Sequence, residues 1–275
     1  MPNVNDEFVV ELVAAGLDRR EARWLVEEFV PGGDPQARDA LWAAATRRLN
    51  GEPLQYVIGH WPFRSLDLDV DRRALIPRPE TEELVDVALR ELALAEVPAP
   101  LIVDLGTGSG AIGLSLVSEL LTRGVAASLI AVDESSDALA LARQNARKHR
   151  LDAVSFVQSS WFDALDASLR GRVDMFVANP PYVGADEFGR LDPILLHEPH
   201  GAIVAEDVAG VAGFADLDLV IRHAYAWLAP TGVLVCEHGE AQRPAVLELT
   251  DAMGYRFAED LDDLSGRPRI LVARR

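Results

Sequence analysis

The chain has 275 residues, 49% of them hydrophobic and 25% charged, a composition that predicts a packed globular protein and excludes a disordered one. The 26 basic and 44 acidic side chains give a formal net charge of −18, and no long Lys/Arg cluster offers the phosphate-neutralising surface of a nucleic-acid binder. With one cysteine, no signal-peptide pattern and no apolar run long enough for a membrane helix, we expect a cytoplasmic protein.

The first part of the chain has the pattern of a small helical bundle. Apolar side chains recur at helical spacing in three stretches, within residues 8–13, 22–29 and 40–45. An alternating pattern over residues 61–70 then predicts a short hairpin. We therefore expect a bundle with a hairpin linker over residues 1–75 and a second domain over residues 76–275.

From residue 101 onward, short apolar runs alternate with helical stretches. The predicted strands cover residues 101–104, 129–133, 154–157, 173–177, 233–236, 255–258 and 270–273. Helices are predicted within residues 112–121, 138–146 and 217–228. This alternation indicates an α/β fold with a mostly parallel sheet covered on both faces. Because such sheets bind ligands beyond the carboxyl ends of their strands, the site is expected at residues 104–110, 133, 159–162, 178–183 and 237–239.

The first of these places carries the run Asp104-Leu105-Gly106-Thr107-Gly108-Ser109-Gly110. Glycines directly after a buried strand allow a sharp turn and let a ligand approach the main chain. Gly108, Gly110 and Gly113 also match the dinucleotide fingerprint, but Gly106 takes the position next to the strand and shifts the frame. The run favours S-adenosylmethionine, with a dinucleotide or a plain strand–helix turn as alternatives.

The next predicted strand ends in an acid, Asp133. A carboxylate in this position can accept hydrogen bonds from both ribose hydroxyls of any adenosine-containing cofactor. The alternative role is a helix N-cap for the stretch that begins near Ser135. Asp133 therefore supports adenosine without selecting one cofactor.

The run Asn179-Pro180-Pro181-Tyr182 follows the strand over residues 173–177. Each proline restricts its own φ and the residue before it, so the run is a stiff arm, although many Asn-Pro sequences are ordinary turns. The Asn179 side-chain oxygen and the Pro180 carbonyl can each accept one hydrogen of a planar NH₂ group. This pair selects an amide or an exocyclic amine, and Tyr182 supplies an aromatic wall.

These motifs together resemble the PrmC (HemK) protein-glutamine methyltransferases. The resemblance extends over almost the whole chain and includes, besides the two runs above, residues 48–59, residues 75–85, Glu198-Pro199, Glu237-His238-Gly239 and Gly266-Arg267-Pro268-Arg269. It implies a Rossmann-like class I methyltransferase domain with a seven-stranded sheet. It also implies methylation of the side-chain amide nitrogen of the glutamine in the Gly-Gly-Gln loop of class I peptide-chain release factors, which supports translation termination.

The resemblance assigns roles to individual residues. It implies that S-adenosylmethionine, which leaves as S-adenosylhomocysteine, is held by Gly106, Thr107, Gly108, Ser109, Gly110, Asp133, Trp161 and Asn179. The glutamine pocket would be formed by Asn179, Pro180, Pro181 and Tyr182, with Asn179 and Pro180 as the catalytic residues. Residues 79–82 would cover the methionine end of the cofactor, and their alternative role is the N-cap of a helix that includes Leu84, Val85 and Val87. No metal is implied.

Two segments depart from the family pattern: Ser160, where relatives often have Asp, and residues 206–214, which are rich in Gly, Ala and Val. The alternatives are an adenine-specific amino-methyltransferase acting on nucleic acid and a non-catalytic protein-binding module with a vestigial sheet. Since 31 of the 44 acidic side chains lie in residues 76–275, against 17 basic ones, the charge disfavours nucleic acid as the substrate. We expect a monomer that binds a release factor through its N-terminal bundle and contacts neither membrane nor nucleic acid.

Overall fold

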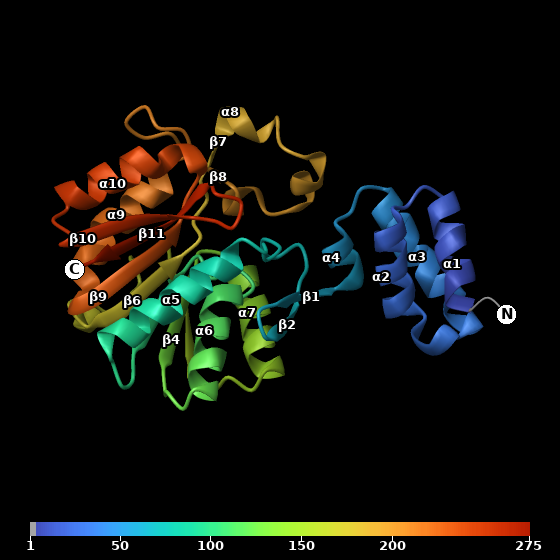
Figure 1. Ribbon diagram of the computed structural model, residues 1–275, viewed down its shortest axis with the longest axis horizontal. Coiled ribbons are helices and arrows are strands. Elements are labelled where there is room, and N and C mark those ends of the chain that lie inside the picture. Colours follow the sequence, from blue (N-terminus) through green and yellow to red (C-terminus); the bar gives the residue numbers. More distant parts are fainter. Residues whose placement is uncertain (1–3) are drawn as a thin grey trace.

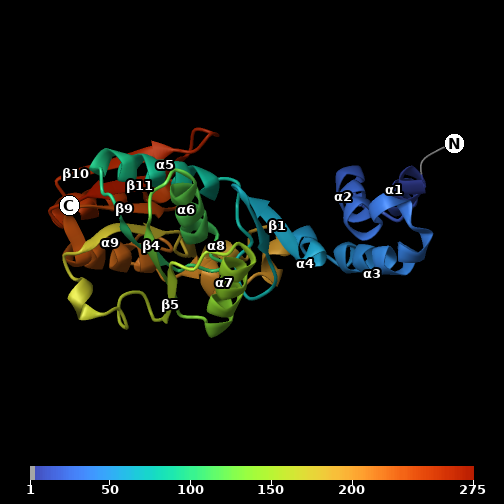
Figure 2. The ribbon, with the colours of Figure 1, turned by 90° about the horizontal axis from the view of Figure 1, so that it is seen from below.

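The computed structural model describes residues 4–275 and has two parts, a helical bundle and a larger α/β body (Figure 1). The three predicted helical stretches of the bundle are confirmed as α1 (Val4–Ala14), α2 (Arg19–Phe29) and α3 (Arg38–Leu49), with 3₁₀ turns at Pro31–Gly33 and Pro35–Ala37. Figure 2 shows these helices grouped at one end of the molecule, away from the sheet.

The bundle has its own hydrophobic core. Leu12, Leu25 and Leu41, one from each helix, are fully buried against one another. The helix α2 begins at Arg19 because the Asp18 carboxylate accepts a hydrogen bond from the Arg20 amide at 2.8 Å, which satisfies one of the unpaired donors of the first turn. Local capping and apolar spacing therefore account for this part of the fold.

A short helix and a hairpin lead from the bundle to the α/β body. They are α4 (Leu54–Ile58), β1 (His60–Phe63) and β2 (Leu66–Asp69). Phe63 and Leu68 of the hairpin are buried in the same hydrophobic cluster as the helices that cover the main sheet. The domain division at residue 75 stays a prediction, while the packing places the hairpin on the α/β body.

The seven-stranded, mostly parallel sheet predicted from the sequence is confirmed. Its strands are β3 (Leu101–Leu105), β4 (Ser128–Asp133), β5 (Val154–Gln158), β6 (Val173–Ala178), β9 (Leu228–Glu237), β10 (Phe257–Asp262) and β11 (Pro268–Arg274). They lie in the order β10-β11-β9-β6-β3-β4-β5, with β11 antiparallel to both of its neighbours and the other pairs parallel. The carboxyl ends of five strands therefore meet at one edge.

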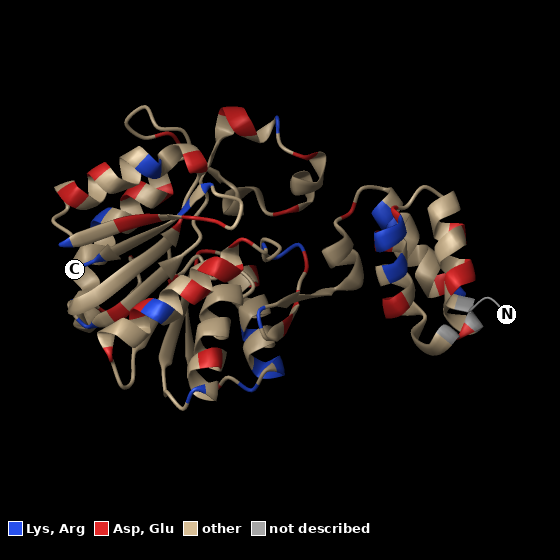
Figure 3. Cartoon of the chain, viewed as in Figure 1, with Lys and Arg blue, Asp and Glu red and all other residues tan. Residues whose placement is uncertain are grey.

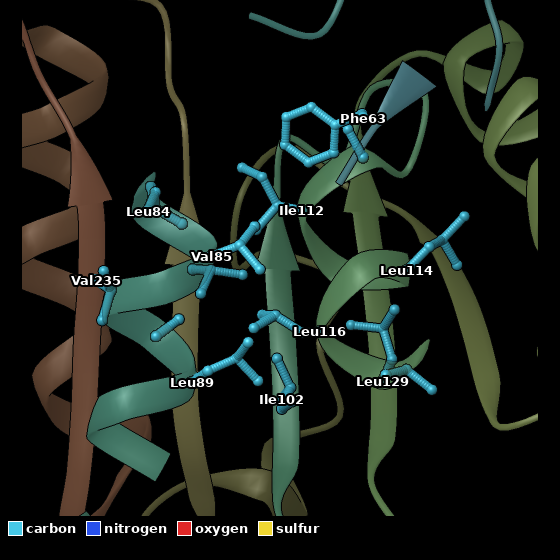
Figure 4. Close-up of a cluster of buried hydrophobic side chains, with 14 of the residues drawn as sticks. Phe63, Leu84, Val85, Leu89, Ile102, Ile112, Leu114, Leu116, Leu129 and Val235 are labelled. Carbon is cyan, nitrogen blue, oxygen red and sulfur yellow. The ribbon is translucent and has the colours of Figure 1, made fainter. Parts of the chain in front are cut away.

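Helices cover both faces of this sheet. One face carries α5 (Thr81–Ala95), α6 (Ala111–Thr122) and α7 (Ser136–Lys148), and the other carries α9 (Ala215–Trp227) and α10 (Arg243–Ala252). Successive strand residues alternate between the two cores: Val235 packs with α5, and Leu234 packs with α9. Figure 4 shows the first core, where Leu84, Val85 and Leu89 of α5 lie beside Ile102 and Val235 of the sheet.

A separate excursion lies between β6 and α9. It contains β7 (Val183–Gly184), α8 (Ala185–Phe188) and β8 (Val204–Ala205), and β7 pairs with β8 in parallel. Figure 1 shows this excursion on the side of the sheet edge that faces the bundle. Acidic residues are spread over both parts of the molecule (Figure 3). Over residues 4–275, no helix combines the length and the apolar character needed to cross a membrane.

Candidate active site

A cavity of about 320 Å³ opens at the carboxyl edge of the sheet. Its walls come from the loops that follow β3, β4, β5 and β6, from the linker over residues 73–78, and from Pro199, Gly201 and Ala202 of the excursion. The places that the sequence indicated after these four strands therefore meet in one cavity, because parallel strands end at the same edge.

The glycine run forms the turn between β3 and α6. Gly106, Thr107, Gly108 and Ser109 line the cavity, and Gly110 is the residue before α6. Gly106 and Gly110 have φ values of +71° and +87°, which disfavour side chains. A Cβ at Gly110 would lie 2.6 Å from the Leu114 side chain, so the turn requires glycine for packing as well as for its backbone angle.

Asp104, near the end of β3, supports this turn from the buried side. It is fully buried, and its Oδ2 accepts hydrogen bonds from the Thr107 hydroxyl at 2.7 Å and the Gly113 amide at 3.0 Å. Burial raises the pKa of the Asp104 carboxyl to about 6. Asp104 thus holds the shape of the loop, while the glycine backbone above it forms the cavity wall.

Asp133 lies on the neighbouring wall, at the end of β4. Its two carboxylate oxygens accept hydrogen bonds from the Gly108 and Ser135 amides, both at 2.9 Å. Burial raises the pKa of the Asp133 carboxyl, and the two amide donors oppose that shift. The helix cap of α7 is supplied instead by Ser135, whose hydroxyl accepts from the Ala138 amide. The structure therefore joins Asp133 to the glycine loop and to the start of α7 at once.

Trp161 lines the cavity beside Gly106. Its indole Nε1 donates to Asp216 Oδ1 of α9 at 3.0 Å, and its φ of +46° is unusual for a bulky residue. Burial raises the pKa of the Asp216 carboxyl, and the indole bond opposes this shift. The sequence offered no signal for Asp216, because its role depends on the packing of α9 against the loop after β5. Ser160, one of the two departures, also lines the cavity.

The linker before α5 forms another wall of the cavity. Residues 73–78 line it, whereas of the predicted cover over residues 79–82 only Thr81 does so. The buried carboxylate of Glu198 holds this linker in place by accepting from the Ile76 amide at 2.9 Å and pairing with the Arg78 guanidinium. The linker residues at the cavity are therefore mainly those just before residues 79–82, and the covering role of residues 79–82 stays a prediction.

The stiff run after β6 contributes two residues to the cavity wall, Asn179 and Pro181. Pro180 is buried, and Tyr182 is half-buried. The Tyr182 hydroxyl accepts from Arg269 Nη1 at 3.3 Å, and burial raises its pKa to about 12. Arg269 is the last residue of the Gly-Arg-Pro-Arg segment and lies at the start of β11, so a C-terminal strand supports the ring.

Asn179 is also held by a hydrogen-bonded chain that no local pattern indicates. Its side-chain Nδ2 donates to the Thr81 hydroxyl at 3.3 Å, and that hydroxyl donates to Glu237 Oε2 at 2.6 Å. Thr81 lines the cavity, and Glu237 is only 2% exposed. The sequence predicted that residues 237–239 lie near the site, but it predicted no role for Glu237.

The arrangement has the features of a site for a nucleotide-type ligand beside a polar group. A glycine backbone and a strand-end carboxylate form one side, and a carboxamide held by buried partners forms the other. The described residues contain no group of three or more His, Cys, Asp or Glu side chains that could hold a metal ion. The polar groups that line the cavity include the Asn179 carboxamide, the Thr81 hydroxyl and the Asp133 carboxylate, which can form hydrogen bonds to a ligand and orient it.

Comparison with known proteins adds independent findings. Residues 99–259 match the model of a methyltransferase domain family. The chain is 40% identical over 247 residues to the release factor glutamine methyltransferase of Haemophilus influenzae, covering 87% of this chain and 81% of that one. It is 40% identical over 267 residues to the protein of the same name from Pseudomonas aeruginosa, covering 97% and 91%.

A solved structure with the same fold is a 16S rRNA methyltransferase of T. thermophilus in complex with AdoMet and guanosine. Its TM-score is 0.54 at 17% identity, and the match covers 78% of this chain and 49% of that one. At this identity the likeness concerns the fold alone, and it agrees with the Rossmann-like architecture of the α/β body.

Proposed function

The chain belongs to the release factor glutamine methyltransferases, and we propose that its cavity holds S-adenosylmethionine beside the side-chain amide of the substrate glutamine. The enzyme methylates a release-factor glutamine, and the amide nitrogen in the Gly-Gly-Gln loop is the proposed acceptor. The observation that carries the site assignment is the meeting of the glycine loop, Asp133 and Asn179 around one cavity.

The residues present fit the cofactor. Gly106 and Gly108 offer a main-chain wall that no Cβ obstructs, and Asp133 places a carboxylate where ribose hydroxyls can donate to it. Trp161 offers an aromatic face for adenine beside Gly106, and Thr107 and Ser109 complete the loop. The cofactor supplies an activated methyl group on a sulfonium, so the protein has to orient the acceptor nitrogen.

Asn179 and Pro180 carry out this orientation. The Asn179 side-chain oxygen and the Pro180 carbonyl each accept one hydrogen of the substrate NH₂, while Pro181 and Tyr182 limit the space around it. Positioning of this kind can supply about 7 to 11 kcal/mol of the activation barrier. Two acceptors also favour the pyramidal nitrogen of the transition state over the planar amide, which is preferential binding of the transition state. Asn179 has no basic group, so the proton leaves to water after the nitrogen has become cationic.

The separate bundle suits recognition of the protein substrate. Its core is complete in itself, and Figure 1 shows it standing apart from the sheet with the excursion and the linker between them. We infer that residues 1–75 bind the release factor and that the enzyme acts as a cytoplasmic monomer without a metal. Deleting residues 1–50 is expected to impair release-factor methylation far more than cofactor binding. Equal losses would contradict this role.

The direct test uses radiolabelled S-adenosylmethionine with a purified class I release factor. The expected result is label on the wild-type factor, none on the Gln→Ala variant of its Gly-Gly-Gln loop, and none on adenine-containing DNA. Label on both factors, or on neither, would contradict the substrate assignment. Label on the DNA alone would instead support the adenine-specific alternative.

A further inference from the structure

Three polar side chains from distant parts of the chain form one buried line that ends at the cavity. Asn179 follows β6, Thr81 is the first residue of α5, and Glu237 is the last residue of β9. The Nδ2 of Asn179 lies 3.3 Å from the Thr81 hydroxyl oxygen, which lies 2.6 Å from Glu237 Oε2. Thr81 is 4% exposed and Glu237 is 2% exposed, so the bond between these two side chains is shielded from bulk water, while Asn179 is half-buried at the cavity.

The chemistry of the three groups determines the direction of every bond in this line. An ionised carboxylate only accepts, so the single hydroxyl hydrogen of Thr81 is donated to Glu237. The Thr81 oxygen can then only accept from Asn179, which must present its NH₂ group to Thr81. The carbonyl oxygen of the Asn179 carboxamide is thereby left for the substrate.

We propose that Thr81 and Glu237 are positioning residues that set the Asn179 carboxamide with its oxygen toward the substrate NH₂ group. The proposal rests on the proposed function, since it explains how Asn179 recognises an amide nitrogen. A carboxamide turned by 180° would present NH₂ to NH₂, and the acceptor nitrogen would lose one of its two hydrogen bonds. The line thus favours a nitrogen that carries hydrogens for Asn179 to accept, and this nitrogen is the atom that receives the methyl group.

The surroundings of Glu237 give this line a pH dependence. The charged or titratable groups that face Glu237 are Arg269 of β11, Glu80 before α5, Cys236 of β9, His238 directly after β9 and Tyr182 after β6. Burial raises the pKa of the Glu237 carboxyl to about 7, while the Thr81 hydroxyl and Arg269 oppose that shift. Below this pH a protonated Glu237 can donate to Thr81, and the Asn179 carboxamide is then no longer held in one orientation.

An ionised Glu237 carboxylate depends on the groups around it, because it is buried. Burying a charge disfavours the folded state unless the charge is well paired. Glu237 receives one hydroxyl at 2.6 Å and the field of Arg269, whose guanidinium lies close enough to donate to the Tyr182 hydroxyl. Glu237 therefore supports Asn179 through Thr81, and Arg269 supports Tyr182, so the two neighbouring charges hold two sides of the proposed glutamine pocket.

The test compares three variants of the full-length enzyme. Thr81→Val removes the hydroxyl at nearly constant volume, Thr81→Ser keeps the hydroxyl, and Glu237→Gln removes the charge. We expect Thr81→Val to lower kcat by about 10 to 100-fold, less than the roughly 100 to 1000-fold loss on removing a group that itself bonds to the reacting atoms, because Thr81 acts through Asn179. The Kd for S-adenosylmethionine should change less than about threefold. Thr81→Ser should restore kcat to within about threefold of the wild type.

The pH profile separates orientation from packing. Wild-type kcat is expected to fall as the pH drops through about 7, the range in which Glu237 takes up a proton, and Glu237→Gln should remove this inflection. The matched control is Thr250→Val, which removes another fully buried threonine hydroxyl, on α10. It should leave kcat and its pH profile unchanged.

A second readout does not depend on turnover. In protein labelled with ¹⁵N at asparagine side chains, the Asn179 NH₂ resonances should shift in Thr81→Val and Glu237→Gln and stay in place in Thr81→Ser and Thr250→Val. Unchanged Asn179 resonances in Thr81→Val, or wild-type kcat and pH profile in that variant, would overturn the proposal. A wild-type enzyme that labels no glutamine would instead contradict the proposed function, and the resonances would still decide whether the line orients Asn179.

Discussion

The two sides of the cavity are built in different ways. On the side of the glycine loop, the main contacts are local or use the backbone: Thr107 bonds to Asp104 three residues away, and the Gly108 amide bonds to Asp133. On the opposite side, Asn179 is held by Thr81, which is 98 residues away, and Thr81 by Glu237, 156 residues away. The first side follows from two adjacent strand–helix turns, whereas the second depends on how α5 packs on the sheet.

This difference predicts that substitutions on the two sides affect different measured quantities. Substitutions on the glycine-loop side should change cofactor affinity, and substitutions on the Asn179 side should change the rate of methyl transfer at saturating cofactor. Variants that changed both quantities equally would show that the two sides act as one unit.

The largest effect is expected for Asn179→Ala. Removing the carboxamide deletes one of the two acceptors for the substrate NH₂, so kcat should fall by at least about a hundredfold, the scale observed when one preorganised hydrogen-bonding group is lost. The Kd for S-adenosylmethionine should stay within about tenfold, or about 1.4 kcal/mol. Single-turnover assays and calorimetry measure the two quantities, and unchanged turnover would contradict the orienting role.

Asp133→Ala should produce the opposite pattern. The change removes the proposed ribose acceptor and leaves the Gly108 and Ser135 amides without their carboxylate partner, so the Kd for S-adenosylmethionine should rise by about 10 to 30-fold. At saturating cofactor, kcat should fall less than about threefold. Asp152→Ala, at an exposed position after α7, is the matched control and should change neither quantity.

The smallest effect is expected for Trp161→Phe. Phenylalanine keeps an aromatic face beside Gly106 but loses the indole donor to Asp216, so the cofactor Kd should rise by about three to tenfold. The rate at saturating cofactor should be unchanged. A drop in kcat without a change in Kd would place Trp161 with the Asn179 side of the cavity and weaken the distinction.

Most of the fold could be predicted because its elements follow local patterns. Each strand of the main sheet overlaps a predicted apolar run. The signal is strongest in the inner strands, which are buried on both faces and apolar along their length, and weakest in the edge strand β10, whose residues 259–262 include three acids. The helix α10 was not predicted: Pro244 near its start is typical of a turn, yet proline is well tolerated in the first helical turn. The short helix α4 was also not predicted, because five residues carry too little periodicity.

The residues of the candidate site likewise divide into those that local sequence patterns predicted and those that depend on the packing of distant elements. The sequence by itself determined that a glycine loop, a strand-end carboxylate and the stiff Asn179-Pro180-Pro181-Tyr182 run would meet, since parallel strands end at one edge. Only the tertiary structure decided that residues 73–78 form a wall, that Asp216 holds Trp161, and that Thr81 and Glu237 hold Asn179. The physical reason is that a hydroxyl or carboxylate accepts many partners, and the packing of distant elements selects the one it meets.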